Sequence, residues 1–114
     1  MRQTCAAALV ALTLAAPAQA DLVIEGRAAQ ALHCSAMLFM VSTLLFDMGE
    51  LSRNDRDAAQ RAALVMLDRV PGTEDQRRRA MVQRFNRIMA TRTPDQLAEE
   101  YATTARWCAR TLLG

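Results

Sequence analysis

The sequence predicts an all-α fold, an up-down-up-down four-helix bundle clamped by one disulfide and preceded by a signal peptide. Four segments repeat apolar residues with the period of a helix, and each is bounded by capping or helix-breaking residues. No segment shows strand-like alternation, and the one run with local β character, Leu22-Val23-Ile24, is too short to form a sheet. The connections between the four segments are short, which makes neighbouring helices antiparallel.

Residues 1–20 have the pattern of a secretory signal peptide. Arg2 precedes an uncharged run from Cys5 to Ala16, and Ala18-Gln19-Ala20 forms an Ala-x-Ala cleavage site. The apolar run is too short to cross a bilayer. We therefore expect cleavage after Ala20, which leaves residues 21–114 as a single helical-bundle domain in the bacterial periplasm.

The first expected helix runs from about Glu25 to Met48 and stops at Gly49. Residues 28–46 carry no formal charge and approach the length of a membrane span, which is about 20 residues. Five polar residues interrupt this stretch: Gln30, His33, Ser35, Ser42 and Thr43. This mixture favours a buried central helix, and a membrane contact is the alternative.

The second helix is expected to follow the capping residue Ser52 and to run to Val70, where Pro71-Gly72 ends it. Its apolar positions are small at one end, so a neighbouring helix can approach closely. They are Ala59, Ala62, Ala63, Met66 and Val70.

Capping boxes open the last two helices. Thr73 precedes Gln76 by three residues, and Thr93 precedes Gln96 by three, with Pro94 at the first helical position. The fourth helix should extend to about Leu113. The stripe expected to face the core is Met81, Val82, Phe85, Ile88 and Met89 in the third helix, and Leu97, Tyr101, Ala105, Cys108 and Leu112 in the fourth.

Cleavage of the signal peptide removes Cys5 and leaves Cys34 and Cys108. In an exported protein such a pair is typically a disulfide, although two soft metal ligands are the alternative. The expected topology places the start of the first helix beside the end of the fourth, so both cysteines fall at one end. The bridge would close a loop of about 75 residues, worth on the order of 4 kcal/mol.

A metal site is one functional hypothesis. His33, Met37 and Met40 stand at i, i+4 and i+7 beside Cys34, and imidazole and thioether groups are donors that Cu(I) prefers. The simpler interpretation is core packing, with the methionines filling gaps.

In length and expected topology the chain is similar to the small periplasmic b-type cytochromes, four-helix bundles that hold haem between a histidine and a methionine. The resemblance implies a pairing of His33 with Met66, Met81 or Met89. Covalent haem attachment is excluded because the sequence has no Cys-x-x-Cys-His motif. The chain is also similar in build to the exported immunity proteins that block cell-wall-degrading toxins. The favoured prediction assigns no cofactor.

The third helix is strongly basic. Between residues 77 and 92 there is no acidic residue, and the arginines are Arg77, Arg78, Arg79, Arg84, Arg87 and Arg92. A cationic amphipathic face can bind an acidic protein, a phosphate-bearing envelope polymer or anionic lipid. We take Arg77, Arg84 and Arg87 as candidate partner-binding residues. A solvated face, partly neutralised by acids of the fourth helix, is the alternative.

The composition leaves few groups for catalysis. The chain has one His, no Lys and three Cys, and its carboxylate pairs lack a second base. The net charge of +2 argues against a general nucleic-acid binder. The sequence thus predicts a non-enzymatic binding or structural role with a protein or envelope partner. The alternative is a metal or haem binder that uses His33 and methionines. The oligomeric state is left open.

Overall fold

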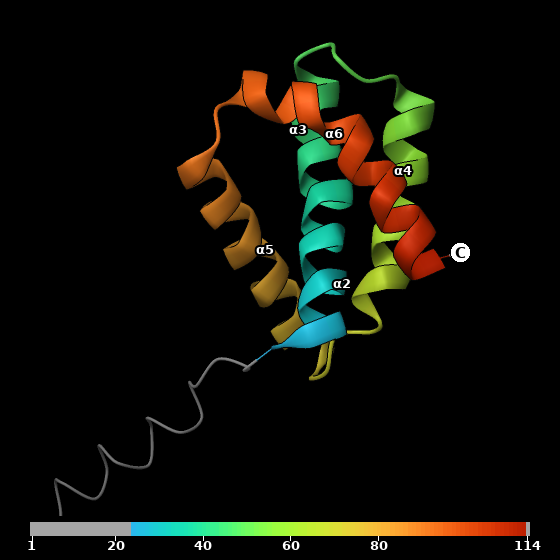
Figure 1. The fold of residues 1–114 in the computed structure, drawn as a ribbon, viewed down its shortest axis with the longest axis vertical. Helices are drawn as coiled ribbons and strands as arrows, with labels where there is room; N and C mark the ends of the chain where they lie inside the picture. The colour runs from blue at the N-terminus through green and yellow to red at the C-terminus, as the bar shows by residue number, and fades with distance from the viewer. Residues whose placement is uncertain (1–23, 114) are drawn as a thin grey trace, which may run out of the picture.

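The computed structural model describes residues 24–113, so the predicted signal peptide lies outside the described residues. Within this range the regular structure is entirely helical, as the sequence predicts (Figure 1). The elements are α2 (Gly26–Ala36), the π-helical turn η1 (Met37–Val41), α3 (Ser42–Asp47), α4 (Arg53–Leu67), α5 (Glu74–Thr91), α6 (Pro94–Cys108) and the π-helical turn η2 (Ala109–Leu113).

Three of these elements, α2, η1 and α3, form one continuous helix, here called the central helix (Gly26–Asp47). The other helices pack against it: α4 and α5 lie on opposite sides in Figure 1, and α6 crosses in front. Successive helices alternate in direction, with α6 running obliquely. The most apolar segment of the described chain therefore packs against all three amphipathic helices.

The central helix ends at the glycine that the sequence indicates. Gly49 has φ 77°, a left-handed conformation that glycine adopts without a side-chain clash. The Glu50 amide donates to the Leu45 carbonyl at 2.8 Å and the Gly49 amide donates to the Phe46 carbonyl at 3.0 Å. These two bonds form a Schellman motif, which satisfies carbonyls that a helix end leaves without partners.

The π-turn within the central helix is a feature that the sequence prediction lacks. The Thr43 hydroxyl donates to the Phe39 carbonyl at 2.8 Å, and Ser42 donates to the carbonyls of Leu38 and Phe39. Upstream, Ser35 donates to Leu32 at 2.8 Å. The hydroxyls that interrupt the apolar stretch are thus satisfied by the backbone of their own helix, so burial leaves none of them without a partner.

The predicted starts of the other three helices are confirmed. The Ser52 hydroxyl accepts from the Asp55 amide, and both capping boxes, at Thr73 and Thr93, form with their glutamine partners. The end of α4 differs from the prediction, because regular helix stops at Leu67 instead of Val70. There the chain tightens into a turn in which the Val70 amide donates to the Leu67 carbonyl three residues back.

The core contains most of the predicted apolar stripes. Its buried members come from every helix: Ala31, Leu32, Cys34, Ala36, Met37, Leu38, Val41, Leu45, Ala59, Ala63, Met66, Leu67, Val70, Met81, Ile88, Leu97, Tyr101, Cys108 and Leu112. Val82 is an error in the predicted stripe, because its side chain is 42% exposed. The buried positions Met81 and Ile88 show that α5 presents a narrower face to the central helix than the sequence stripe suggests.

By length and mean hydropathy (1.5), the central helix could cross a membrane. Core helices pass the same test. Here its buried residues face α4, α5 and α6, and the residues left half-exposed include Phe39, Met40 and Leu44.

Candidate functional site

The two cysteines meet where the central helix passes the end of α6. Their sulfur atoms lie 2.07 Å apart, the Cα atoms are separated by 5.7 Å, and both side chains are fully buried. The predicted Cys34–Cys108 pairing is therefore confirmed. Nearby, the Arg27 guanidinium donates to the Thr111 carbonyl at 3.1 Å, a second tie between the start of the central helix and the end of the described chain.

His33 lies beside this disulfide in a positively charged environment. Its imidazole is half-buried, and the pKa of His33 is lowered first by this burial and then by the charges of Arg84 and Arg92. The carboxylate of Glu100 opposes these effects. Glu100 also forms an ion pair with Arg92, in which Oε1 lies 3.3 Å from the arginine Nε. This ion pair joins the end of α5 to α6. The polar groups around His33 thus come from both α5 and α6.

These surroundings do not favour the proposed metal site. Met37 is only 2% exposed and packs in the core, whereas Met40 lies half-buried in a shallow apolar groove with Phe39, Leu44 and Phe85. The π-turn begins at Met37 and changes the residue spacing that would align Met40 with His33. A cation at His33 would also be repelled by Arg84 and Arg92. In the range 24–113, no cluster of three His, Cys, Asp or Glu side chains could hold a metal ion.

The haem alternative requires Met66, Met81 or Met89 as the second ligand beside His33. Met66 is fully buried in α4, Met81 is nearly so in α5, and Met89 is half-buried near the end of α5. Met66 and Met81 are members of the continuous core cluster. Their thioethers fill the space between helices, the packing role that an unbranched side chain suits.

The three candidate partner-binding arginines occupy different surroundings. Arg77 turns back to the α4–α5 loop and donates to the carbonyls of Gly72 at 3.2 Å and Val70 at 3.5 Å. Arg84 is half-buried, and its buried Nε has no acceptor among the described residues. Arg87 is exposed. The structure therefore leaves one of the three free on the surface, and gives Arg77 a structural role.

A more exposed basic surface lies on the side of α5 opposite Arg77 and Arg84. This surface, here called the outer α5 face, comprises the exposed residues Arg79, Val82, Gln83, Asn86 and Arg87. Four side chains, Arg78, Arg79, Val82 and Gln83, line a shallow groove of about 370 Å³. The sequence pattern includes Arg79 and Arg87 but assigns Val82 to the core, so it does not show that an apolar side chain lies between the two charges.

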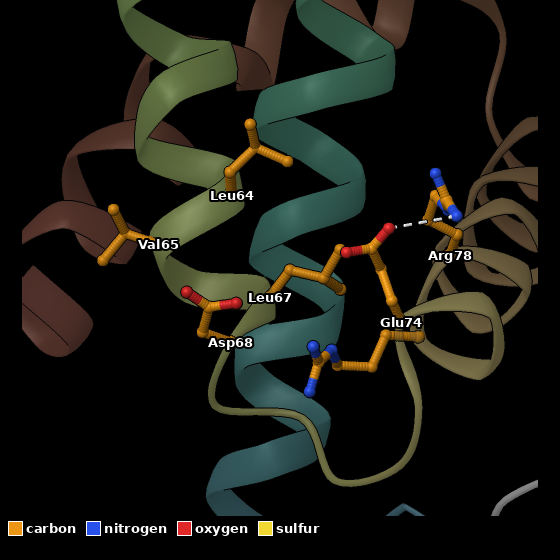
Figure 2. Close-up of a pocket in the computed structure, with 7 residues that line it drawn as sticks. Leu64, Val65, Leu67, Asp68, Glu74 and Arg78 are labelled. Carbon is orange, nitrogen blue, oxygen red and sulfur yellow. Dashed lines mark ion pairs between the residues drawn. The ribbon is translucent and has the colours of Figure 1, made fainter.

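A second groove lies between α4 and α5. It has a volume of about 340 Å³, and its lining residues are Leu64, Val65, Leu67, Asp68, Glu74, Arg77 and Arg78. Figure 2 shows Leu67 directed from α4 toward the central helix, with the Glu74–Arg78 ion pair across from it (3.2 Å). The sequence pattern does not indicate this groove, because the helical repeat of apolar residues in α4 marks only its inner side.

Comparison with known proteins gives no relative: no protein-family model, curated protein or solved structure matches this chain.

Proposed function

We propose that the chain is exported, loses residues 1–20, and acts in the bacterial periplasm as a non-enzymatic binding protein. In this proposal the mature domain is a disulfide-clamped, up-down-up-down four-helix bundle. The partner is an acidic surface of a protein or of another envelope component. The Ala-x-Ala site before Asp21 and the buried Cys34–Cys108 pair support an exported chain, because disulfides persist in oxidising compartments.

The observation that carries the binding role is the outer α5 face. Arg79 and Arg87 are exposed there about two helical turns apart, with the exposed Val82 between them, and none of the residues that define the face is acidic. An apolar side chain flanked by arginines can contribute both desolvation and charge at an interface. The nearest acids, Glu74 and Asp75, pair with Arg78 and leave Arg79 and Arg87 uncompensated in the described ion pairs.

The described titratable groups with displaced pKa values support binding over catalysis. Tyr101 has its pKa raised to about 12 by burial, and its hydroxyl lies with Ser42 inside the core. Burial and, after it, the charges of Arg84 and Arg92 lower the pKa of His33, and its sequence neighbour Cys34 is oxidised. The Ser42 hydroxyl next to Tyr101 donates to the backbone carbonyls of Leu38 and Phe39, so a backbone bond holds the proton that a nucleophilic serine would have to give up.

Binding is tested with the double variant R79E/R87E. We expect it to lose capture of the acidic partner in crosslinking pull-downs from the native envelope, and to lose any cosedimentation with phosphatidylglycerol vesicles. The matched control is R106E/R110E, which makes the same change of charge at exposed arginines near the end of α6 and in η2. Equal capture by both double variants and the unaltered protein would contradict the assignment of the outer α5 face.

Export is tested separately. Mass spectrometry of protein recovered from the periplasm should give a chain that begins at Asp21 and contains no free thiol. A chain that retains residues 1–20, or one with two reactive cysteines, would contradict the proposed maturation.

A further inference from the structure

Helix α4 is apolar on two sides. Its inner side, with Ala59, Ala63 and Met66, is buried against the central helix. On its outer side Leu64 and Val65 are 52% and 53% exposed, more than any other large apolar side chain of the described residues. Exposed neighbouring apolar side chains of this size mark interaction surfaces more often than scattered single ones do.

The charges around Leu64 and Val65 have a symmetrical arrangement. Arg61 precedes Leu64 by three residues and Asp68 follows Val65 by three, so the four residues stand at i, i+3, i+4 and i+7 on one face of the helix. We call this set the outer α4 face. Both charged residues are exposed, and neither forms an ion pair within residues 24–113. One end of the face is therefore positive and the other negative, with the apolar pair between them.

We propose that the outer α4 face binds a second copy of this chain, with the two α4 helices packed antiparallel about a two-fold axis that passes between residues 64 and 65. A two-fold interface requires a surface that is complementary to itself. In this register Leu64 lies opposite the partner's Val65. Arg61 lies opposite the partner's Asp68, and the symmetry makes this ion pair twice.

The remaining positions along α4 are compatible with the same register. It places Arg69 opposite the partner's Gln60 and Ala58 opposite the partner's Pro71, so no two like charges face each other. A parallel arrangement would instead set Arg61 against the partner's Arg61 and Asp68 against the partner's Asp68. Like charges directly opposed are destabilising. The charge pattern thus selects the antiparallel dimer.

The groove beside α4 extends the apolar surface available to the partner. Leu64, Val65 and Leu67 contribute to its lining, and Asp68 stands at its edge (Figure 2). A side chain from the second copy that passes Leu64 would enter this groove instead of meeting solvent. The outer α4 face is separate from the outer α5 face, so the inference does not depend on the proposed partner binding.

The expected dimer is weak and salt-sensitive. A contact built mainly on one helix falls at the small end of specific interfaces, below about 1,200 Å² in total, and its ion pairs are exposed at the rim. We expect dissociation constants on the order of 10 µM to 1 mM, which sedimentation equilibrium of the processed protein measures directly.

The decisive experiment exchanges the charges. In R61D each of the two ion pairs becomes a pair of facing aspartates, and in D68R each becomes a pair of facing arginines. Each single variant should therefore weaken self-association by at least about tenfold. The double variant R61D/D68R restores both ion pairs and should dimerise like the unaltered protein. Mixing the two single variants should give a heterodimer, because each then supplies the charges that the other needs. R106D on α6 is the control for a change of net charge and should dimerise normally.

Two results would overturn the proposal. One is a protein that stays monomeric at about 1 mM, whether or not its outer α4 face captures some other molecule. The other is a dimer that R61D and D68R leave unchanged. Circular dichroism of each variant verifies the fold, and recovery in R61D/D68R or in the mixture shows that loss in a single variant comes from charge and not from unfolding.

Discussion

At the scale of single residues, the packing around His33 changes the proton affinity of its imidazole. Burial and the charges of Arg84 and Arg92 act in the same direction on its pKa, and only Glu100 opposes them. Protonation of this imidazole in the folded chain would place a third positive charge beside the two guanidinium groups. The folded state therefore prefers neutral His33.

This preference predicts a stability that falls on acidification. Because the pKa of His33 is lower in the folded chain than its unfolded value of about 6.5, the unfolded chain binds more protons below that pH. The free energy of unfolding should thus decrease as the pH falls from about 7 toward 5.

The variant His33→Gln should lose part of this slope, and as the chain has one histidine the difference can be assigned to it. Urea unfolding at several pH values gives both slopes. Parallel pH dependence in the variant and the unaltered chain would contradict the assignment.

At the scale of elements, side-chain caps set the starts of α4, α5 and α6. In the last of these the Thr93 hydroxyl accepts from the Gln96 amide at 3.2 Å, while the Gln96 side chain accepts from the Thr93 amide at 2.8 Å. These local bonds depend on residues three apart, which explains why the sequence predicts the helix starts well.

Replacement of the capping residue Thr93 should lower the stability of the folded chain measurably. Thr93→Ala removes the acceptor for the Gln96 amide and should lower the free energy of unfolding by about 1 kcal/mol, whereas Thr93→Ser should keep most of it. Thr73→Ala tests the same bond at the start of α5. Urea midpoints unaffected by either alanine would show that these caps do not contribute to stability.

At the scale of the whole molecule, one covalent bond and one hydrogen bond tie the early central helix to the end of the chain. Cys34 and Cys108 are 74 residues apart in sequence, and Arg27 reaches the Thr111 carbonyl beside them. A loop of this length loses much conformational entropy when it is closed in the unfolded chain.

Loss of the bridge should therefore lower stability strongly. Reduction, or the double variant C34S/C108S, should decrease the free energy of unfolding by about 4 kcal/mol, a large part of the total for a small domain. Urea unfolding followed by circular dichroism measures the difference, with R106E/R110E as a control that leaves the bridge intact. A reduced chain as stable as the oxidised one would contradict this prediction.

Patterns a few residues long determine much of this protein. Glycine at 49, the caps at Ser52, Thr73 and Thr93, and the apolar repeats define four helices, because each depends on bonds within one turn or on one helix period. The Cys34–Cys108 pairing also followed from the sequence, since only two cysteines remain after the predicted cleavage and helix order puts them at one end.

The tertiary structure decided the rest. The π-turn of the central helix, the exposure of Val82, Leu64 and Val65, and the placement of two arginines around His33 all depend on three helices that pack on one central helix. The apolar period shows that a helix has an apolar side but does not show how wide a strip its neighbours cover. Which side chains remain outside, and thus which surfaces can bind, is set by packing between segments distant in sequence.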